Sequence, residues 1–289
     1  MDDTGIHQAS DAAAPPASTR LDPVIRVDGV RQVFTSASTR EPLVALERID
    51  VEIGRQELVT FIGPSGCGKS TLLNVIGGMV EPTEGAAFVD GQQVRGPLPK
   101  KIAYIFQESA LLPWASVLDN IKVALEFQGV PRQQRHSRAV AALKAVGLSR
   151  FSASYPHQLS GGMKQRVALA RSLSLETEIL LMDEPFAALD EQTRMVFGED
   201  LSGLLANTRK TIVLVTHSLA EAVFLSDRIF VFTSRPGLIK DVIAVDEPHP
   251  RNPVFMTSPK FTEIRNRLYV LLREEVRRAM AESFEGTGE

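Results

Sequence analysis

The stretch ELVTFIGPSGCGKSTLLNVI, residues 57–76, decides the fold that this sequence predicts. Its first six residues are mostly apolar and include β-branched and aromatic side chains, which favours a short strand. Glycines follow, and then a helix-like run that ends at Gly77 and Gly78. The order strand, glycine loop, helix lets backbone N–H groups surround phosphate oxygens at a helix N-terminus. The stretch therefore predicts an α/β protein with a phosphate-binding loop.

The glycine loop itself, Gly63 to Ser70 (GPSGCGKS), matches the pattern G-x-x-x-x-G-K-[ST] at every position. In this pattern the lysine, here Lys69, supplies a positive charge for the β and γ phosphates of a nucleotide. The hydroxyl of Ser70 is placed to bind Mg²⁺. A chance glycine turn is the alternative, but the strand before the loop and the helix after it favour nucleotide binding. Cys67 needs no chemical role beyond filling the loop.

The totals of the chain fit one large or two small globular domains. It has 289 residues, of which 44% are hydrophobic and 23% are charged. A net charge of −3 gives no reason to expect nucleic acid as a partner. The single cysteine excludes an internal disulfide and fits a reducing compartment. With no run of 18 apolar residues and no signal peptide, we expect a cytoplasmic chain that can dock to an integral membrane partner.

Composition also divides the chain into segments. Residues 1–22 are rich in Ala, Asp, Ser and Pro, which predicts a disordered tail. Short β-rich runs such as VIRV and RQVF begin at Val24, and EILLMD, TIVLVT and RIFVF follow later. Residues 108–175 look mostly helical, with apolar side chains at i, i+3 and i+4 in ASVLDNIKVALEF and HSRAVAALKAVGL. We expect an α/β domain over 23–250 with a helical subdomain at about 108–175.

Residues 251–289 form an expected C-terminal helical extension, whose helix starts at Ser258 and Pro259. Seven apolar residues then recur on one face: Phe261, Ile264, Leu268, Leu271, Leu272, Val276 and Met280. Glutamates balance the arginines of the polar face, whereas a membrane-surface helix would be basic there. We therefore expect the apolar face to pack on the chain's own domain.

Polar residues follow three of the predicted strands, at the sheet edge where open α/β proteins bind their ligands. Asp183 and Glu184 follow ILLM; in P-loop enzymes a carboxylate here helps to hold Mg²⁺, which suits Asp183. Glu184 is then placed to polarise an attacking water. Gln107 follows AYIF and can touch both Mg²⁺ and a water, whereas His217 closes TIVLVTH. Taken alone, Gln107 is more simply a solvated loop residue, and a lone histidine at a strand end is more often structural than catalytic. The position of His217 after a core strand favours a role in the site.

A second small turn, LSGGM at residues 159–163, opens another predicted helix about ninety residues after Ser70. A free helix N-terminus attracts phosphate through its N–H groups and its dipole. Simple kinases and GTPases need no second phosphate-binding helix start. A glycine turn before an amphipathic helix is the alternative interpretation.

Taken in order, GPSGCGKST, Gln107, LSGGMKQR, LLMDEP, AALD and TH resemble the ATP-binding subunit of an ABC transporter over roughly residues 24–245. The resemblance implies an ABC-type P-loop NTPase core sheet with a helical subdomain insert, and ATP and Mg²⁺ as cofactors. It also implies two subunits that meet head to tail. The LSGG helix of one then closes over the γ-phosphate bound by the other.

The resemblance implies a role for each matching residue. The implied phosphate-binding residues are Gly63, Pro64, Ser65, Gly66, Cys67, Gly68, Lys69, Ser70 and Thr71. Ser160, Gly161 and Gly162 would act across the dimer, and Asp190 in AALD would link the two sites. At Ala187 or Ala188 the family more often has serine.

The implied catalytic residues are Lys69, Gln107, Glu184 as general base and His217 as γ-phosphate sensor. The implied Mg²⁺ residues are Ser70, Gln107 and Asp183. Phe34 is the best match for the aromatic residue that stacks on adenine, and a core phenylalanine is the alternative.

Finer patterns narrow the type. YPHQLSGGM, LLPWASVLDNI, EPFAALDEQTR and SRPG resemble the nitrate, sulfonate and taurine group of importer ATPases. That resemblance implies an ATP-hydrolysing subunit that energises uptake of a small solute through a separate membrane permease. Its partners would be a second copy or a paralogous ATPase subunit, the permease and, indirectly, a solute-binding protein, but no nucleic acid. It would be peripheral on the cytoplasmic face of the inner membrane.

Two points stay open at the level of sequence. The segment from Ser109 to Trp114 would face the permease, so Trp114 is either an interface anchor or part of the core of the helical insert. The alternative functions are a soluble ABC ATPase of the iron–sulfur-assembly type and the ATPase subunit of an exporter.

Overall fold

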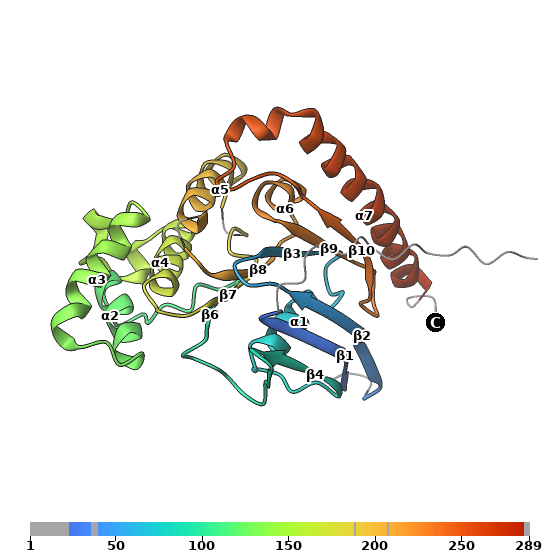
Figure 1. The fold of residues 1–289 in the computed structure, drawn as a ribbon, viewed down its shortest axis with the longest axis horizontal. Helices are drawn as coiled ribbons and strands as arrows, with labels where there is room; N and C mark the ends of the chain where they lie inside the picture. Colours follow the sequence, from blue (N-terminus) through green and yellow to red (C-terminus); the bar gives the residue numbers. More distant parts are fainter. Residues whose placement is uncertain (1–22, 36–39, 188, 207, 286–289) are drawn as a thin grey trace, which may run out of the picture.

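The computed structural model describes residues 23–35, 40–187, 189–206 and 208–285. The tail expected over residues 1–22 and Ala188 lie outside the described residues. The strands form two sheets, with one group of helices at one end of the molecule and a long C-terminal helix at the other (Figure 1). This is the α/β architecture that the glycine loop predicts.

The central sheet has six strands in the order β10-β9-β3-β8-β7-β6. These strands are β3 (Leu58–Ile62), β6 (Ile102–Ile105), β7 (Ile179–Asp183), β8 (Thr211–Val215), β9 (Arg228–Phe232) and β10 (Ile239–Ala244). All neighbours pair in parallel except β10, which is antiparallel to β9. Every residue of β3, β7 and β8 is buried, as expected for parallel strands covered on both faces. The strands predicted from ELVTFI, EILLMD, TIVLVT and RIFVF are confirmed.

A smaller antiparallel sheet has the order β2-β1-β4-β5. Its strands are β1 (Ile25–Thr35), β2 (Pro42–Ile53), β4 (Glu84–Val89) and β5 (Gln92–Gln93). The predicted runs VIRV, from its second residue Ile25, and RQVF belong to the single strand β1, whose pairing with β2 shifts register between Val27 and Val33. β2 was missed at the level of sequence, although residues 49–53 alternate between buried and exposed.

Helix α1 (Lys69–Ile76) lies between the two sheets, in contact with β1, β2 and β4 on one side and β7 and β8 on the other. It begins directly after Gly68, whose φ of 97° favours glycine. A Cβ atom on Gly68 would lie 2.5 Å from Cδ2 of Leu46 and 2.7 Å from the carbonyl oxygen of Ala45. Glycine therefore lets the loop pack directly against β2.

The two faces of the central sheet belong to two cores. Val59 and Phe61 of β3 pack with α1, whereas Leu58 and Ile62 pack with the opposite core. This opposite core includes residues of α5 (Glu191–Ala206) and α6 (Leu219–Leu225). The two-residue period of a strand separates the side chains in this way.

The helical insert lies at one end of the molecule (Figure 1, left). It contains α2 (Val117–Phe127), α3 (Arg132–Ala145), α4 (Gly161–Leu173) and the 3₁₀ turns η1 (Ser149–Phe151) and η2 (Pro156–Gln158). The prediction that residues 108–175 are mostly helical is confirmed, although the part before Val117 is irregular. Helix α3 begins earlier than HSRAVAALKAVGL predicts, because Pro131 stands directly before the first helical residue, where its fixed φ suits a helix start.

The C-terminal part contains the 3₁₀ turn η3 (Pro253–Thr257) and the helix α7 (Pro259–Glu285). The predicted start at Pro259 is confirmed. Phe261 and Leu268 are buried against η3 and α6, as expected. The expectation is wrong for the last turns, where Val276 and Met280 are 39% and 58% exposed. There the helix is held by polar contacts of Glu275 with β10 and the loop before it.

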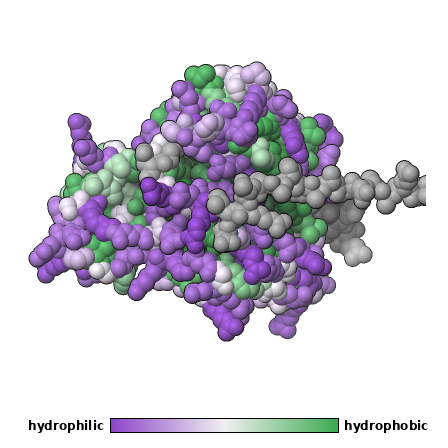
Figure 2. Space-filling view, in the orientation of Figure 1, coloured by the Kyte–Doolittle hydropathy of each residue, from purple (hydrophilic) through white to green (hydrophobic). Residues whose placement is uncertain are grey.

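The face seen in Figure 2 is largely hydrophilic over the helical insert and the smaller sheet, with apolar residues in separate small areas. None of the described helices is both long enough and apolar enough to span a bilayer.

Candidate functional site

The glycine loop, residues 63–70, lies at the carboxyl end of β3, where β7 and β8 also end. A cavity of ≈ 440 Å³ opens at this edge of the sheet. Its lining residues are Phe34, Leu43, Ala45, Ser65, Gly66, Gly68, Lys69, Ser70, Thr71, Gln107, Glu184 and Arg235. The parallel topology therefore gathers residues from distant parts of the chain around one hollow.

Lys69 is buried in the glycine loop. Its Nζ donates hydrogen bonds to the carbonyl oxygens of Gly63 (2.9 Å) and Pro64 (2.8 Å), and lies 3.6 Å from Sγ of Cys67. Burial raises the pKa of the Cys67 thiol, and the charge of Lys69 only partly opposes this. The thiol is therefore neutral at physiological pH and fills the loop.

Ser70 and Asp183 form the candidate metal site. The Ser70 hydroxyl donates a hydrogen bond of 2.8 Å to Oδ1 of Asp183. Burial raises the pKa of Asp183, and the bond from Ser70 opposes this shift. A hydroxyl and a carboxylate oxygen this close fit Mg²⁺, which takes oxygen ligands and uses few protein groups beside phosphates and water. Across the described ranges, no cluster of three His, Cys, Asp or Glu residues could enclose an ion by itself.

Glu184 has a left-handed backbone, with φ of 45°. Such a conformation costs a non-glycine residue roughly 1–2 kcal/mol. Its N–H group donates to the carbonyl oxygen of Val215 (2.9 Å), and its own carbonyl accepts from the N–H group of Ala187 (3.1 Å). This turn points the carboxylate toward two other predicted catalytic groups. Oε2 accepts from Nε2 of Gln107 (3.3 Å) and lies 3.4 Å from Nδ1 of His217.

Helix α4 holds the segment that begins at Gln107, and the sequence analysis does not predict this contact. Gln165, buried on α4, donates from Nε2 to the carbonyl oxygen of Gln107 (2.7 Å). Arg171 donates to the carbonyl oxygens of Ser109 (3.2 Å) and Ala110 (2.9 Å). The only available signal was a pair of long polar side chains six residues apart on one helix.

Trp114 lies farther along the same segment and is 75% exposed, so the alternative that it belongs to the core is wrong. Asn120 fixes the backbone around it. Its side chain accepts from the N–H group of Leu112 (2.7 Å) and donates to the carbonyl oxygens of Leu112, Ala115 and Ser116. The tryptophan is therefore displayed on a well-anchored backbone.

One aromatic and one basic side chain, those of Phe34 and Arg235, complete the wall of the cavity. Phe34 is 40% exposed at the end of β1, which excludes the alternative of a core phenylalanine. Arg235, which belongs to the SRPG segment, also lines the cavity, and no sequence pattern predicts a role for it. Its Nε and Nη2 donate to the carbonyl oxygen of Gly66 at 3.2 and 3.1 Å.

The second predicted phosphate-binding turn lies elsewhere. Ser160 caps α4 by accepting from the N–H group of Met163 (3.3 Å), and Ser160 and Gly161 are exposed. Asp190 accepts from the N–H group of Thr193 (2.9 Å) at the start of α5. That bond, together with one from the Thr193 side chain and weaker ones from nearby backbone N–H groups, lowers the pKa of Asp190. Neither Ser160, Gly161 and Gly162 nor Asp190 is among the described residues that line the glycine-loop cavity.

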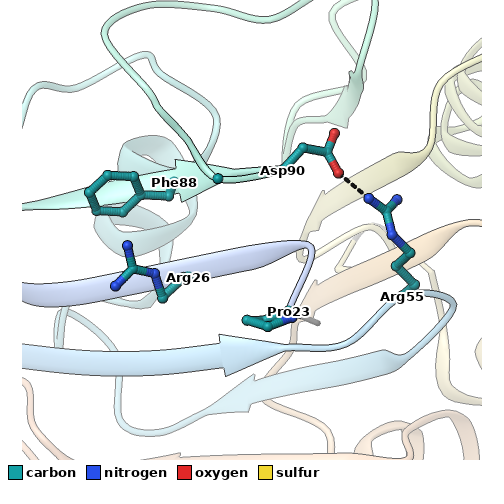
Figure 3. Close-up of a pocket in the computed structure, with 6 residues that line it drawn as sticks. Pro23, Arg26, Arg55, Phe88 and Asp90 are labelled. Carbon is teal, nitrogen blue, oxygen red and sulfur yellow. Dashed lines mark hydrogen bonds and ion pairs between the residues drawn. The ribbon is translucent and has the colours of Figure 1, made fainter. Parts of the chain in front are cut away.

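A second cavity, of ≈ 390 Å³, lies near the amino end of β3, away from the glycine loop (Figure 3). Arg26 stacks on Phe88 and also pairs with Asp28. Arg55 pairs with Asp90 across the cavity, as Figure 3 shows. Because carboxylates of the same chain already neutralise the charge of both arginines, we assign no ligand to this cavity.

The matching family model describes an ABC transporter and covers residues 46–187. The chain is 43% identical over 261 residues to an uncharacterised ABC transporter ATP-binding protein of Methanocaldococcus jannaschii, covering 90% of this chain and 96% of that protein. It is 39% identical over 264 residues to the taurine import ATP-binding protein TauB of Rhizobium johnstonii (89% and 100%). It is 40% identical over 255 residues to the nitrate import ATP-binding protein NrtD of Synechocystis (86% and 95%).

Among solved structures, a dimeric ATP-binding cassette in a post-hydrolysis state, bound to ADP and Pi, is similar to this chain. The TM-score is 0.69 at 32% identity, and the match covers 78% of this chain and 100% of the other.

Proposed function

The chain belongs to the ABC transporter family and is an ABC-type ATP hydrolase, and from this premise we propose that it is the ATPase subunit of an importer. In this proposal it energises uptake of a small solute of the nitrate, sulfonate or taurine kind through a separate permease. A solute-binding protein takes part indirectly, and the chain sits peripherally on the cytoplasmic face of the inner membrane. The taurine and nitrate import proteins named above support this choice.

The proposed domains follow the sequence boundaries. Residues 23–250 form the ATP-binding domain, with a helical subdomain at about 108–175, and residues 251–289 form a C-terminal extension. Residues 1–22 are proposed to be a tail and lie outside the described residues.

The proposed chemistry uses the groups that meet at the glycine-loop cavity. The loop N–H groups and Lys69 bind the phosphates; Lys69 must leave the carbonyl groups of Gly63 and Pro64 to do so. Ser70, Gln107 and Asp183 would hold Mg²⁺, which supplies charge neutralisation when bound. Phe34 stacks on the adenine ring.

Hydrolysis then needs a water aligned with the γ-phosphorus. Glu184 accepts a proton as the water oxygen forms its bond to phosphorus and the bond to the bridging oxygen breaks, which releases ADP and phosphate. Gln107 and His217, which both reach the Glu184 carboxylate, orient that carboxylate and the γ-phosphate.

A second copy, or a paralogous subunit, completes the site. Ser160, Gly161 and Gly162 are proposed to close over the ATP of the partner subunit, and Asp190 to link the two sites. Two observations support this: these residues do not line the cavity of their own chain, and the similar solved cassette is dimeric.

One observation supports the permease partner above the others, namely the exposed Trp114 on the segment that starts at Gln107. An aromatic side chain that is 75% exposed on a pinned backbone is typical of an interface anchor. Because the same segment carries Gln107, a movement of the permease against Trp114 would be transmitted through this segment to the ATP site.

The test is recovery of the tagged full-length chain from detergent-solubilised membranes of its own cells. We expect it to bring down a multi-spanning membrane protein, and Trp114→Ala to lower that recovery by roughly tenfold or more, as for an interface hot spot. Tyr269→Ala is the matched control, since Tyr269 is an exposed aromatic residue of α7. Helix α7 and the helical insert lie on different sides of the molecule (Figure 1). Recovery of the chain from the soluble fraction alone, with no membrane protein attached, would contradict the proposal.

A further inference from the structure

The loop between β9 and β10, residues 233–238, packs against both the glycine loop and β2; we refer to it as the β9–β10 loop. Gly237 donates its N–H group to the carbonyl oxygen of Ala45 and accepts from the N–H group of Glu47, both at 3.0 Å. A Cβ atom on Gly237 would lie 2.1 Å from the carbonyl oxygen of Cys67. Only glycine allows this backbone-to-backbone contact, so the β9–β10 loop is built onto the phosphate-binding loop.

Arg235 extends from the β9–β10 loop into the wall of the nucleotide cavity. Two of its N–H groups bind the carbonyl oxygen of Gly66, beside the backbone that would hold phosphate. A guanidinium has five N–H donors, so further donors remain for an anion. No carboxylate of the described part of the chain pairs with it, unlike Arg26, Arg55 and Arg228. An unneutralised guanidinium beside a phosphate site is suited to binding phosphate oxygens.

The other side of the β9–β10 loop is held by the C-terminal helix. Glu275 of α7 is fully buried and accepts hydrogen bonds from the N–H group (2.9 Å) and the hydroxyl (3.4 Å) of Ser234. Its second oxygen accepts from Nζ of Lys240 at 2.7 Å. Burial alone would raise the pKa of Glu275, but the bonds from Lys240 and Ser234 lower it below its usual range. Glu275 is therefore ionised and fixes the residue next to Arg235.

We propose that Arg235 contacts the phosphate chain of the bound nucleotide, and that Glu275 is the positioning residue that holds it there through Ser234. The C-terminal helix is then part of the nucleotide site. This inference rests on the proposed function, because it takes ATP as the ligand of the cavity.

The first experiment measures the dissociation constant of ADP, which the enzyme does not hydrolyse. We expect Arg235→Gln to raise it about tenfold at low salt, as for losing a charge-assisted hydrogen bond. The excess should shrink at high salt, because salt screens attraction between charges. Loss of a purely structural bond to the neutral carbonyl of Gly66 would give a salt-independent change. Arg235→Lys, which keeps the charge, should recover part of the affinity.

The matched control is Arg267→Gln. Arg267 pairs with Asp241 outside the cavity, at 2.7 Å, so its removal should change ADP affinity less than twofold. If Arg235→Gln binds ADP as tightly as the wild type at low salt, the proposed contact is wrong and ATP binding by the chain is unaffected. If the wild type binds neither ADP nor ATP, or binds them no better than Lys69→Ala, the proposed function itself fails.

The second experiment compares two neighbouring glutamates of α7. Both bind Lys240, but only Glu275 reaches Ser234. We expect Glu275→Gln to raise the KM for ATP severalfold with kcat within twofold, and Glu274→Gln to change neither. In the Arg235→Gln background, Glu275→Gln should add nothing to KM. A merely structural Glu275 would lower the thermal midpoint without this selective effect on KM, and that result would overturn the positioning role. If Arg235→Gln does not fold, the comparison of Glu275→Gln with Glu274→Gln still tests the proposed positioning role.

Discussion

Oε2 of Glu184 is the meeting point of three residues that follow three different strands. Gln107 comes after β6, Glu184 after β7 and His217 after β8, and these strands are neighbours in the central sheet. Parallel strands place their carboxyl ends at one edge, so residues 33 to 110 positions apart meet there. The left-handed turn at Glu184 is the local adjustment that brings its carboxylate into this contact.

The first prediction at this scale concerns Glu184→Gln. The amide keeps the size of the side chain but cannot accept a proton, so ATP should bind while turnover falls by about 10² to 10⁴. Filter binding of ATP and phosphate release measure the two properties separately. Glu263→Gln, an exposed change on α7, serves as the control. Near-normal turnover in Glu184→Gln would remove its assignment as general base.

The second prediction concerns the stability that the chain loses by burying the carboxylate of Asp183. Its pKa is raised mainly by burial, so the folded state binds its proton more tightly than the unfolded state does. By linkage, the ionised carboxylate lowers stability as pH rises above the ordinary value of about 4. Asp183→Asn should therefore have a higher thermal midpoint than the wild type without nucleotide, by a margin that grows from pH 4 toward neutrality.

The same Asp183→Asn variant should lose roughly 10²-fold or more in turnover, because it no longer supplies negative charge at the proposed Mg²⁺ site. Calorimetry across pH and phosphate release give the two readouts. A midpoint below that of the wild type at neutral pH would show that the buried charge stabilises the fold instead.

At the scale of elements, α2 and α4 act as clamps on the irregular segment between β6 and α2. Gln165 and Arg171 of α4 hold its start, and Asn120 of α2 holds its end. An irregular segment must satisfy its backbone groups with side chains, because it lacks the ladder of a helix or sheet. The sequence predicts the helices from their apolar spacing, but not which of their polar residues turn inward.

Asn120→Ala tests this clamp. It removes the partners of the Leu112 N–H group and of the buried Ala115 carbonyl oxygen, whereas the carbonyl groups of Leu112 and Ser116 keep backbone partners. A buried group left unsatisfied costs about 1–3 kcal/mol, so the free energy of unfolding should fall by about that much. Trp114 is the only tryptophan of the chain, and its fluorescence anisotropy should drop as the segment loosens. Asn252→Ala removes one exposed hydrogen bond at η3 and should leave the anisotropy unchanged. Unaltered anisotropy and stability in Asn120→Ala would mean that the segment is held by other contacts.

At the scale of the whole molecule, the two proposed phosphate-binding ends of one chain do not share a cavity. The glycine loop lies at the edge of the central sheet, whereas Ser160 opens α4 in the helical insert. We have proposed that two chains complete each other's sites. A cyclic pair gives two equivalent composite sites, each with the glycine loop of one copy and the LSGG turn of the other.

Mixing two inactive variants tests this arrangement. Lys69→Ala disables the glycine loop, and Ser160→Phe blocks the helix end. In a mixed dimer one site combines the intact halves, so roughly a quarter of wild-type turnover should return if subunits exchange freely and sites act independently. Each variant alone should stay inactive, and circular dichroism checks that Ser160→Phe folds. Full activity of the wild type as a strict monomer would refute the composite site.

The sequence by itself determined the buried strands, the glycine loop, the helix after it and the family to which the chain belongs. These features are local: a fully apolar run reads as a buried parallel strand, and G-x-x-x-x-G-K-[ST] encodes its own loop geometry. The start of α7 could likewise be predicted from neighbouring residues, because Ser258 and Pro259 favour a helix start. The strand β2 was not predicted, because the alternation of buried and exposed residues covers only its last five residues.

Only the tertiary structure decided which residues from distant segments meet. In the folded chain Trp114 is exposed, Gln165 is buried, and the last apolar residues of α7 remain partly exposed. The tertiary structure also joined Glu275, Ser234 and Arg235 into one connection between the C-terminal helix and the glycine loop. Such contacts depend on strand order and on how the elements pack, and the spacing of residues along a chain does not encode distances between elements.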